Sequence, residues 1–143
     1  MFSDLESLKY PQRFAVSLHQ MPSHQSRPTH FDLFLEKEDF LMSWILPAQL
    51  SDQMNTFVTP NRNHRKDYLD YEGPISQDRG TIHRVQQGRL LWKQSDKNLV
   101  EALLRLDNRT YTLTIDRIGE ESSDPPNEQW RLQLKECEPE SLH

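Results

Sequence analysis

The sequence lacks most of the features that mark secreted or membrane-bound proteins. It contains a single cysteine, Cys137, which excludes an internal disulfide framework and suits a reducing compartment. No run of residues approaches the roughly 20 apolar residues of a membrane-spanning helix. Residues 1–12 are polar and acidic and offer no apolar core of a signal peptide. We therefore expect a cytoplasmic protein that does not enter a membrane.

Apolar residues and positive charges are also scarce. Only 34% of the 143 residues are hydrophobic, which supports one modest core and predicts a single domain over residues 1–143. Within it, we expect residues 1–12 to form an N-terminal arm and residues 136–143 to form a tail. The net charge of −5 excludes a surface that is basic throughout, as in many nucleic-acid-binding domains, but it leaves room for a local basic patch.

Several common catalytic motifs are missing as well. The chain has no phosphate-binding P-loop, no dinucleotide-binding glycine fingerprint and no Cys-x-x-Cys pair. No arrangement of serine, histidine and aspartate indicates a covalent nucleophile. What the chain does have is six histidines, three of which fall within residues 19–30.

Short stretches of alternating apolar and polar residues recur along the chain and predict β-strands. The expected strands cover residues 13–19, 30–36, 40–46, 80–85, 89–94, 99–106, 110–118 and 129–135. Residues 96–104 fit a helix as an alternative. We predict an all-β fold, a small closed or partly open β-barrel of about eight strands with at most one or two short helices.

The clearest strand begins with His30, and Asp32 follows two residues later. Side chains two positions apart in a strand point the same way, so this pair can approach one ion. An imidazole and a carboxylate suit Mn, Zn or Fe(II). Two ligands are too few, and either His19 or His24 is placed to supply a third. A solvated histidine beside a solvated aspartate is the simpler alternative.

A second cluster of interest mixes basic and aromatic side chains. His64 offers a proton donor and Tyr68 offers a phenol hydroxyl. Arg62, Arg65 and Lys66 add positive charge, and the combination suits a phosphate group. Arg79, in a later turn, can aim a guanidinium at the same anion. Charge runs and turn arginines also occur in ordinary solvated loops, so both interpretations stay open.

Several short motifs follow one another between residues 13 and 88. They are Phe14 to His19, His30-Phe31-Asp32 with Leu35-Glu36, Ser43-Trp44, His64 with Tyr68, and Tyr71-Glu72-Gly73. In this order they resemble the 3′-phosphoesterase domain of bacterial and archaeal DNA ligase D. The ordered set is far more specific than any one of its pieces.

The resemblance implies a small β-barrel with metal-dependent phosphoesterase activity, here as a free-standing relative of that domain. It makes His19, His30 and Asp32 the ligands of a divalent metal, typically manganese, with zinc or iron as alternatives. It makes His64 the phosphate-contacting residue or general acid, and Tyr68 a phosphate ligand. The implied reaction removes a 3′-terminal ribonucleoside from DNA and then the 3′-phosphate that remains. Expected partners are DNA 3′ ends or another phosphoester, and DNA-repair proteins.

Two positions depart from the family pattern. Phe34 stands where the family has an arginine two residues after the aspartate, and Arg79 or Arg62 would have to replace that phosphate-binding group. The family's ligand spacing fits His24, whereas the family's first strand ends at His19, which we favour. Phe34 also supports a second hypothesis, a metal-containing barrel without turnover that binds nucleic-acid ends or a repair protein. A metal-dependent barrel with unrelated chemistry is a third.

Overall fold

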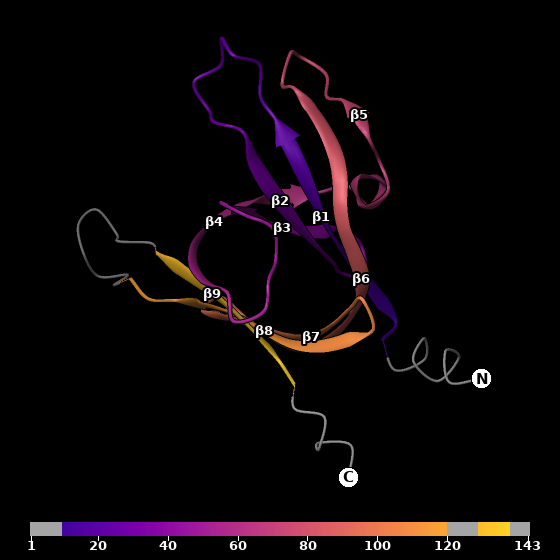
Figure 1. The fold of residues 1–143 in the computed structure, drawn as a ribbon, viewed down its shortest axis with the longest axis vertical. Coiled ribbons are helices and arrows are strands. Elements are labelled where there is room, and N and C mark those ends of the chain that lie inside the picture. The colour runs from indigo at the N-terminus through magenta and orange to yellow at the C-terminus, as the bar shows by residue number, and fades with distance from the viewer. Residues whose placement is uncertain (1–9, 120–128, 138–143) are drawn as a thin grey trace.

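The structure is a computed structural model that describes residues 10–119 and 129–137, and strands dominate it (Figure 1). Its elements are β1 (Gln12–Gln20), β2 (His30–Glu36), β3 (Leu41–Leu46), β4 (Asn55–His64), the short 3₁₀ helix η1 (Lys66–Leu69), β5 (Gly73–Pro74), β6 (Thr81–Ser95), β7 (Leu99–Leu106), β8 (Arg109–Arg117) and β9 (Trp130–Glu136). Most of the predicted arm (residues 1–9) and of the predicted tail (residues 138–143) lies outside the described residues.

All the described strands belong to one antiparallel sheet, in the order β1-β2-β3-β4-β9-β8-β7-β6-β5. β1 also pairs with β6, so the eight strands other than β5 close into a ring. β1 and β6 run side by side into the upper part of Figure 1. The ring confirms the predicted all-β, barrel-like fold, and η1 is the only helical element in the described part of the chain. No helix among these residues is long and apolar enough to cross a membrane.

Alternation of side chains explains the strands of the second half. Every second residue of β7 is buried, and most of β8 follows the same pattern, so one face of each strand lies in the core. Asp96 fixes the turn before β7, because its Oδ1 accepts backbone hydrogen bonds from Asn98 (2.8 Å) and Leu99 (3.0 Å). The alternative helix over residues 96–104 is therefore wrong: the backbone from Leu99 onward is satisfied by pairing with β6 and β8.

Two further sequence expectations are corrected. The strands expected at 80–85 and 89–94 are one continuous strand, β6, which pairs first with β1 and then with β7. Gly88 lies inside this strand because a Cβ there would come within 1.9 Å of the carbonyl oxygen of Arg105. The alternation pattern also misses β4, since this strand is mostly polar and contains Pro60.

The two faces of the ring carry separate apolar clusters. The larger cluster draws buried residues from all eight ring strands and therefore fills the interior of the ring. The smaller cluster lies on the outer face, against η1, and its buried members are Ala15, Phe34, Leu41, Leu69 and Ile82. β2 contributes to both clusters, with Leu33 and Leu35 facing inward and Phe34 facing outward. Side chains on the outer face of β1 and β2 are thus buried outside the main core.

Candidate metal and phosphate site

Three polar side chains converge on this covered outer face of β1 and β2. His19 and His30 are directly opposite each other in the antiparallel pair, and Asp32 points to the same side as His30. All three are buried, with exposed fractions of 9%, 7% and 3% respectively. One ligand atom from each lies within 4.8 Å of the others, so the strands bring together a group that can hold a metal ion.

Backbone carbonyls fix how the two imidazoles present their nitrogens. His30 Nδ1 donates to the carbonyl of Pro28 (2.9 Å), and His19 Nε2 donates to the carbonyl of Arg79 (2.7 Å). A carbonyl oxygen only accepts, so these nitrogens carry the ring protons of the neutral histidines. The other nitrogens, His30 Nε2 and His19 Nδ1, each face a carboxylate oxygen of Asp32 at 3.1 Å.

Three acceptors therefore point at one another when the histidines are neutral. Such an arrangement is stable only with a proton or a cation between them. Burial opposes ionisation of the Asp32 carboxyl, yet its bonds to His19 and His30 lower its pKa below the ordinary value. The bond to Asp32 in turn raises the pKa of His19 despite burial. Both shifts come from the same contacts, which favour an ionised carboxylate with positive charge beside it. Two imidazoles with one carboxylate fit a divalent transition-metal ion.

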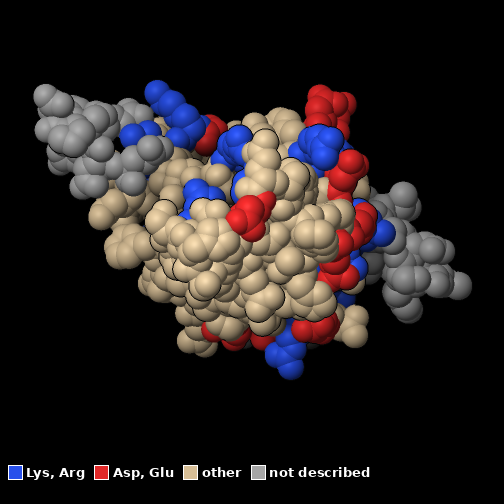
Figure 2. Space-filling view, turned by 90° about the horizontal axis from the view of Figure 1, so that it is seen from above, with Lys and Arg blue, Asp and Glu red and all other residues tan. Residues whose placement is uncertain are grey.

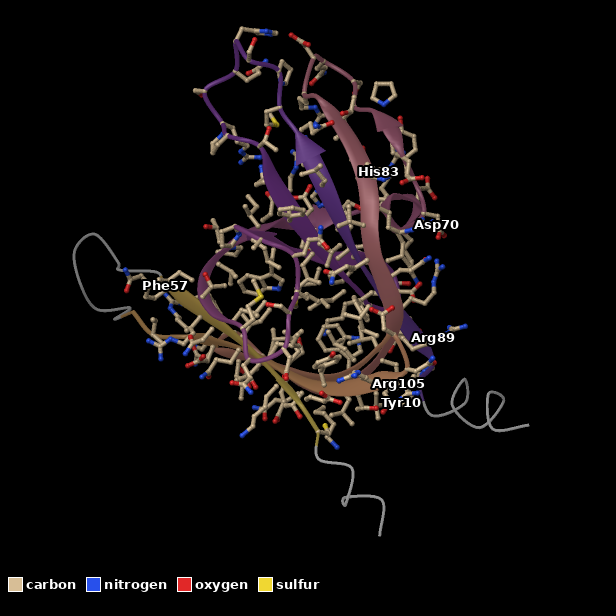
Figure 3. All side chains as sticks on the ribbon, viewed as in Figure 1. Tyr10, Phe57, Asp70, His83, Arg89 and Arg105 are labelled. Atoms are coloured by element: carbon tan, nitrogen blue, oxygen red, sulfur yellow. The ribbon has the colours of Figure 1, made fainter. Side chains whose placement is uncertain are left out.

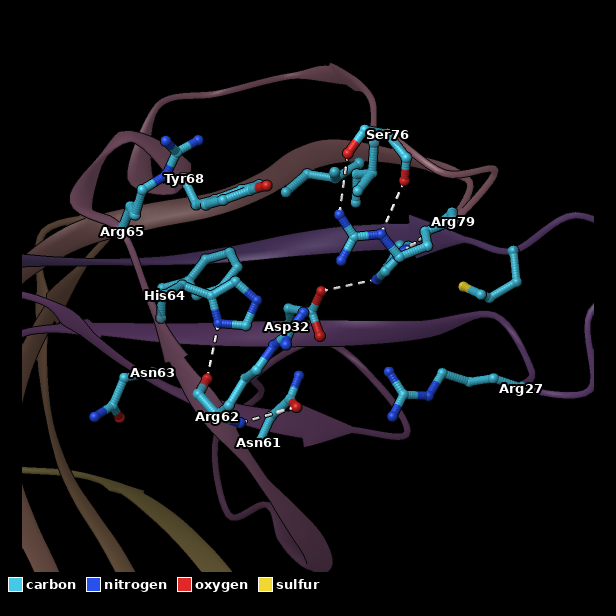
Figure 4. Close-up of a pocket in the computed structure, with 15 residues that line it drawn as sticks. Arg27, Asp32, Asn61, Arg62, Asn63, His64, Arg65, Tyr68, Ser76 and Arg79 are labelled. Carbon is cyan, nitrogen blue, oxygen red and sulfur yellow. Dashed lines mark hydrogen bonds and ion pairs between the residues drawn. The ribbon is translucent and has the colours of Figure 1, made fainter.

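The group opens onto a cavity of about 710 Å³ that is lined by four arginines, Arg27, Arg62, Arg65 and Arg79. Asp32 is the only acidic residue among the described residues that line it. Figure 4 places Asp32 near the centre, with Arg27 and Arg79 on one side and His64 on the other.

This positive charge is local to the cavity. Lys and Arg side chains lie beside Asp and Glu side chains on the face seen from above (Figure 2), and the chain as a whole carries a net charge of −5. Arginine side chains around a cavity favour an anion such as a phosphate group.

Ser76 holds the guanidinium of Arg79 in place. Arg79 Nε donates to the carbonyl of Ser76 (2.8 Å), and a terminal nitrogen donates to its hydroxyl (3.2 Å). The carbonyl of Arg79 meanwhile anchors His19. One turn thus orients both an arginine of the cavity and His19, a member of the group of His19, His30 and Asp32 that we call the triad.

An aromatic group forms the opposite wall. The ring of His64 lies 5.2 Å from the ring of Phe34 and 5.3 Å from that of Tyr68, measured between centroids. His64 Nδ1 donates to the carbonyl of Arg62 (2.9 Å), which leaves Nε2 as the free position of the neutral ring. Burial lowers the pKa of His64. Phe34 is 1% exposed, so the position of the family's arginine is closed by an apolar ring.

The structure brings the residues singled out in the sequence to one place. His19, Asp32, Arg62, His64, Tyr68 and Arg79 all line the cavity, and His30 contacts Asp32. His24, the alternative third ligand, does not join them, because it pairs with Asp78 at an exposed position.

Sequence reasoning missed one arginine of the cavity, Arg27. Arg27 lies in the long loop between β1 and β2, where nothing in the sequence relates it to the other basic residues. Arg65 was expected in the phosphate cluster together with Arg62 and Lys66, and it lines the cavity. Lys66, its neighbour, instead pairs with Glu36 at 3.2 Å.

We expect the purified protein to bind Mn²⁺ through the triad. Isothermal titration of metal-free protein should give one site, and metal at a hundred times its Kd should stabilise the fold by about 2.7 kcal/mol. His30→Ala and Asp32→Asn should each weaken binding beyond the roughly 10–100-fold typical of losing an outer-shell partner. His24→Ala serves as the matched control and should bind as wild type. Equal affinity in all variants contradicts the assignment.

We also expect the imidazole of His64 to be neutral at pH 7. Burial disfavours the imidazolium form, so the ring should protonate only as the pH falls below its ordinary pKa of about 6.5. A proton NMR titration of the six histidines measures this, with His64→Gln identifying the signal. A His64 signal that titrates at or above its ordinary pKa is the result that contradicts the assignment.

Comparison with known protein families places most of this site in a recognised domain. Residues 22–122 match the DNA ligase D 3′-phosphoesterase domain. The matched span extends well beyond the sequence motifs and contains His30, Asp32, His64, Tyr68 and Arg79, while His19 lies just before it. None of the curated proteins compared with the chain matches it. Because the match covers more than half of the sequence, the chain belongs to the DNA ligase D 3′-phosphoesterase domain family.

Proposed function

We propose that this chain is a metal-dependent phosphoesterase that processes 3′ ends of DNA. It would remove a 3′-terminal ribonucleoside and then the 3′-phosphate left behind. Membership of the family supports 3′-phosphoesterase-like activity in general. The observation that carries the proposal is the opening of the His19–His30–Asp32 group onto a cavity lined by arginines.

The triad supplies the donor set for the metal. The free nitrogens of His19 and His30 and the carboxylate of Asp32 would hold Mn²⁺, with Zn²⁺ or Fe²⁺ as alternatives. A bound ion of this kind polarises a phosphoryl oxygen and lowers the pKa of water. The carbonyls of Pro28 and Arg79 keep both imidazoles oriented, as outer-shell partners do in metal sites.

The arginines take the role of binding the phosphate. Phe34 cannot donate a hydrogen bond, so the guanidinium that the family carries at this position must come from elsewhere. Arg79 is the best-prepared substitute, because Ser76 already fixes its direction and it lines the same cavity as Asp32. Arg62 lines this cavity from β4. Donors fixed in advance bind a developing negative charge without reorganisation.

His64 would transfer a proton to the leaving oxygen, and Tyr68 would hydrogen-bond the phosphate. In the free protein His64 Nδ1–H donates to the Arg62 carbonyl, so Nε2 is the basic position of the neutral ring. A phosphate anion bound beside it would favour the imidazolium form and place a second proton on Nε2. That proton can pass to the leaving oxygen, which is general-acid catalysis. The hydroxyl of Tyr68 would donate to a phosphate oxygen.

Phe34 also supports a second candidate function. A domain that keeps the triad but has lost the family's arginine can bind nucleic-acid 3′ ends, or a protein of a repair complex, without turnover. The buried contact of Phe34 with His64 replaces a charged group with an apolar one inside the cavity. The four arginines that remain around the cavity favour the enzyme.

Incubation with Mn²⁺ and a primer–template tests the proposal directly. The primer should end in a 3′-ribonucleotide in one reaction and a 3′-phosphate in the other. We expect the wild-type chain to shorten the first primer and dephosphorylate the second, and EDTA or His30→Ala to abolish both products. If the wild-type chain gives no more product than His30→Ala but still binds the primer's 3′ end in a binding assay, the chain is a binding module.

Arg79→Ala should lower kcat/KM on the 3′-phosphate primer by about 10²–10³, the usual cost of removing one fixed donor to a transition-state oxyanion. Arg62→Ala should lower it less, because no described side chain fixes its guanidinium. Arg89→Ala, an exposed arginine of β6 outside the cavity, is the control and should act as wild type. Unchanged phosphate-analogue binding in both Arg79→Ala and Arg62→Ala contradicts the substitution of the family arginine.

A further inference from the structure

A second cavity of about 400 Å³ adjoins the first. The two share Arg65, Tyr68, Ile75 and Ser76, so a ligand can occupy both at once. The second cavity adds Asp67, Tyr71 and Pro74 to its lining. Its size falls within the roughly 300–1,000 Å³ of small-molecule sites. Nothing in the proposed chemistry at the phosphate uses it.

Tyr71 gives this cavity a rigid aromatic wall. The residue is 39% exposed, which is unusual for a large hydrophobic residue in the described part of the chain. The hydroxyl donates to the carbonyl of Pro74, and the ring stands against that of Tyr68 with centroids 5.9 Å apart at 76°. Gly73 permits this closure, since its φ is +136° and a Cβ there would lie 3.1 Å from the Tyr71 hydroxyl.

The turn that carries Tyr71 is held from both sides. The backbone N–H of Tyr71 donates to the carbonyl of Asp67 in η1 (3.0 Å). The next residue, Glu72, accepts the backbone N–H of Arg84 (2.8 Å) and pairs with His83 (2.7 Å), which ties the turn to β6. An exposed aromatic ring fixed in this way loses little freedom when a ligand packs on it.

We propose that this second cavity binds the nucleobase of the nucleotide that carries the 3′-phosphate, stacked on Tyr71. The inference rests on the proposed function and names its substrate subsite. Aromatic faces beside a basic phosphate site are how proteins bind unpaired bases. The same nucleotide carries the phosphate when the ribonucleoside is removed and when the 3′-phosphate is removed, so one subsite serves both reactions.

Two charged residues of this cavity suit a base. Arg65 lines both cavities, so its guanidinium can reach the phosphate or lie against the base plane. The carboxylate of Asp67 only accepts, which matches the amino group of cytosine, adenine or guanine. Deoxycytidine 3′-phosphate is therefore a suitable probe.

Calorimetric titration with EDTA present, so that no turnover occurs, tests the subsite. The probes are deoxycytidine 3′-phosphate and the abasic sugar 1,2-dideoxyribose 3-phosphate. We expect wild type to bind the nucleotide more tightly than the sugar phosphate. Tyr71→Leu should weaken nucleotide binding by about fivefold to a hundredfold, the range for losing one base–aromatic stack, and should leave sugar phosphate binding unchanged.

Phe57→Leu is the matched control. Phe57 is also an exposed aromatic residue, at 58%, but it lies in β4 on the opposite side of the molecule from Asp70, the residue that follows η1 (Figure 3). This variant should bind both probes as wild type does. The unchanged affinity of Tyr71→Leu for the sugar phosphate shows that the variant is folded.

Equal wild-type affinity for the two probes overturns the subsite, as does a Tyr71→Leu variant that binds the nucleotide as tightly as wild type. A wild-type protein that binds neither probe overturns it too. The turnover assay is separate. Base-dependent binding that needs Tyr71, without any product from a 3′-end primer, contradicts the proposed catalysis and leaves the subsite standing.

Discussion

The site depends on a buried contact in which two imidazole nitrogens and a carboxylate, all hydrogen-bond acceptors, face one another. His19 and His30 each donate one ring N–H to a backbone carbonyl. The other nitrogen of each ring, which carries a lone pair, lies 3.1 Å from a carboxylate oxygen of Asp32. Three buried acceptors this close repel one another unless a positive charge lies between them. The repulsion arises from the fold itself, because antiparallel pairing of β1 and β2 puts the two histidines opposite each other. A proton or a divalent cation between them removes this repulsion.

The closed ring allows such a site on its outer face. Its interior is filled by a cluster drawn from all eight strands, which forms the main core. The outer face of β1 and β2 carries the buried polar group beside the smaller apolar cluster that packs against η1. The segment between η1 and β6 serves the site three times: the Arg79 carbonyl orients His19, Ser76 orients the Arg79 guanidinium, and Tyr71 forms a wall of the second cavity.

Local patterns predicted much of this, and long-range contacts account for the rest. Period-two alternation located β2, β7 and β8, and the spacing of His30 and Asp32 put both on one face. The same pattern missed β4, because most of its residues are polar and Val58 is its one buried residue. It also split β6 at Gly88, whose role is a close approach to Arg105. The resemblance favoured His19 over His24, and the register of β1 with β2, which the sequence alone does not give, puts His19 opposite His30. Arg27 could not be assigned, since loop conformation decides where its side chain points.

The central claim is that both histidines and Asp32 bind one metal ion. Pulsed electron paramagnetic resonance of the Mn²⁺-loaded protein tests it most directly, because directly bound imidazole nitrogens couple to the metal's electron spin. The account predicts two such nitrogen couplings, one of which disappears in His19→Ala and the other in His30→Ala. A bound Mn²⁺ signal without nitrogen coupling, or one unchanged in both variants, would contradict it.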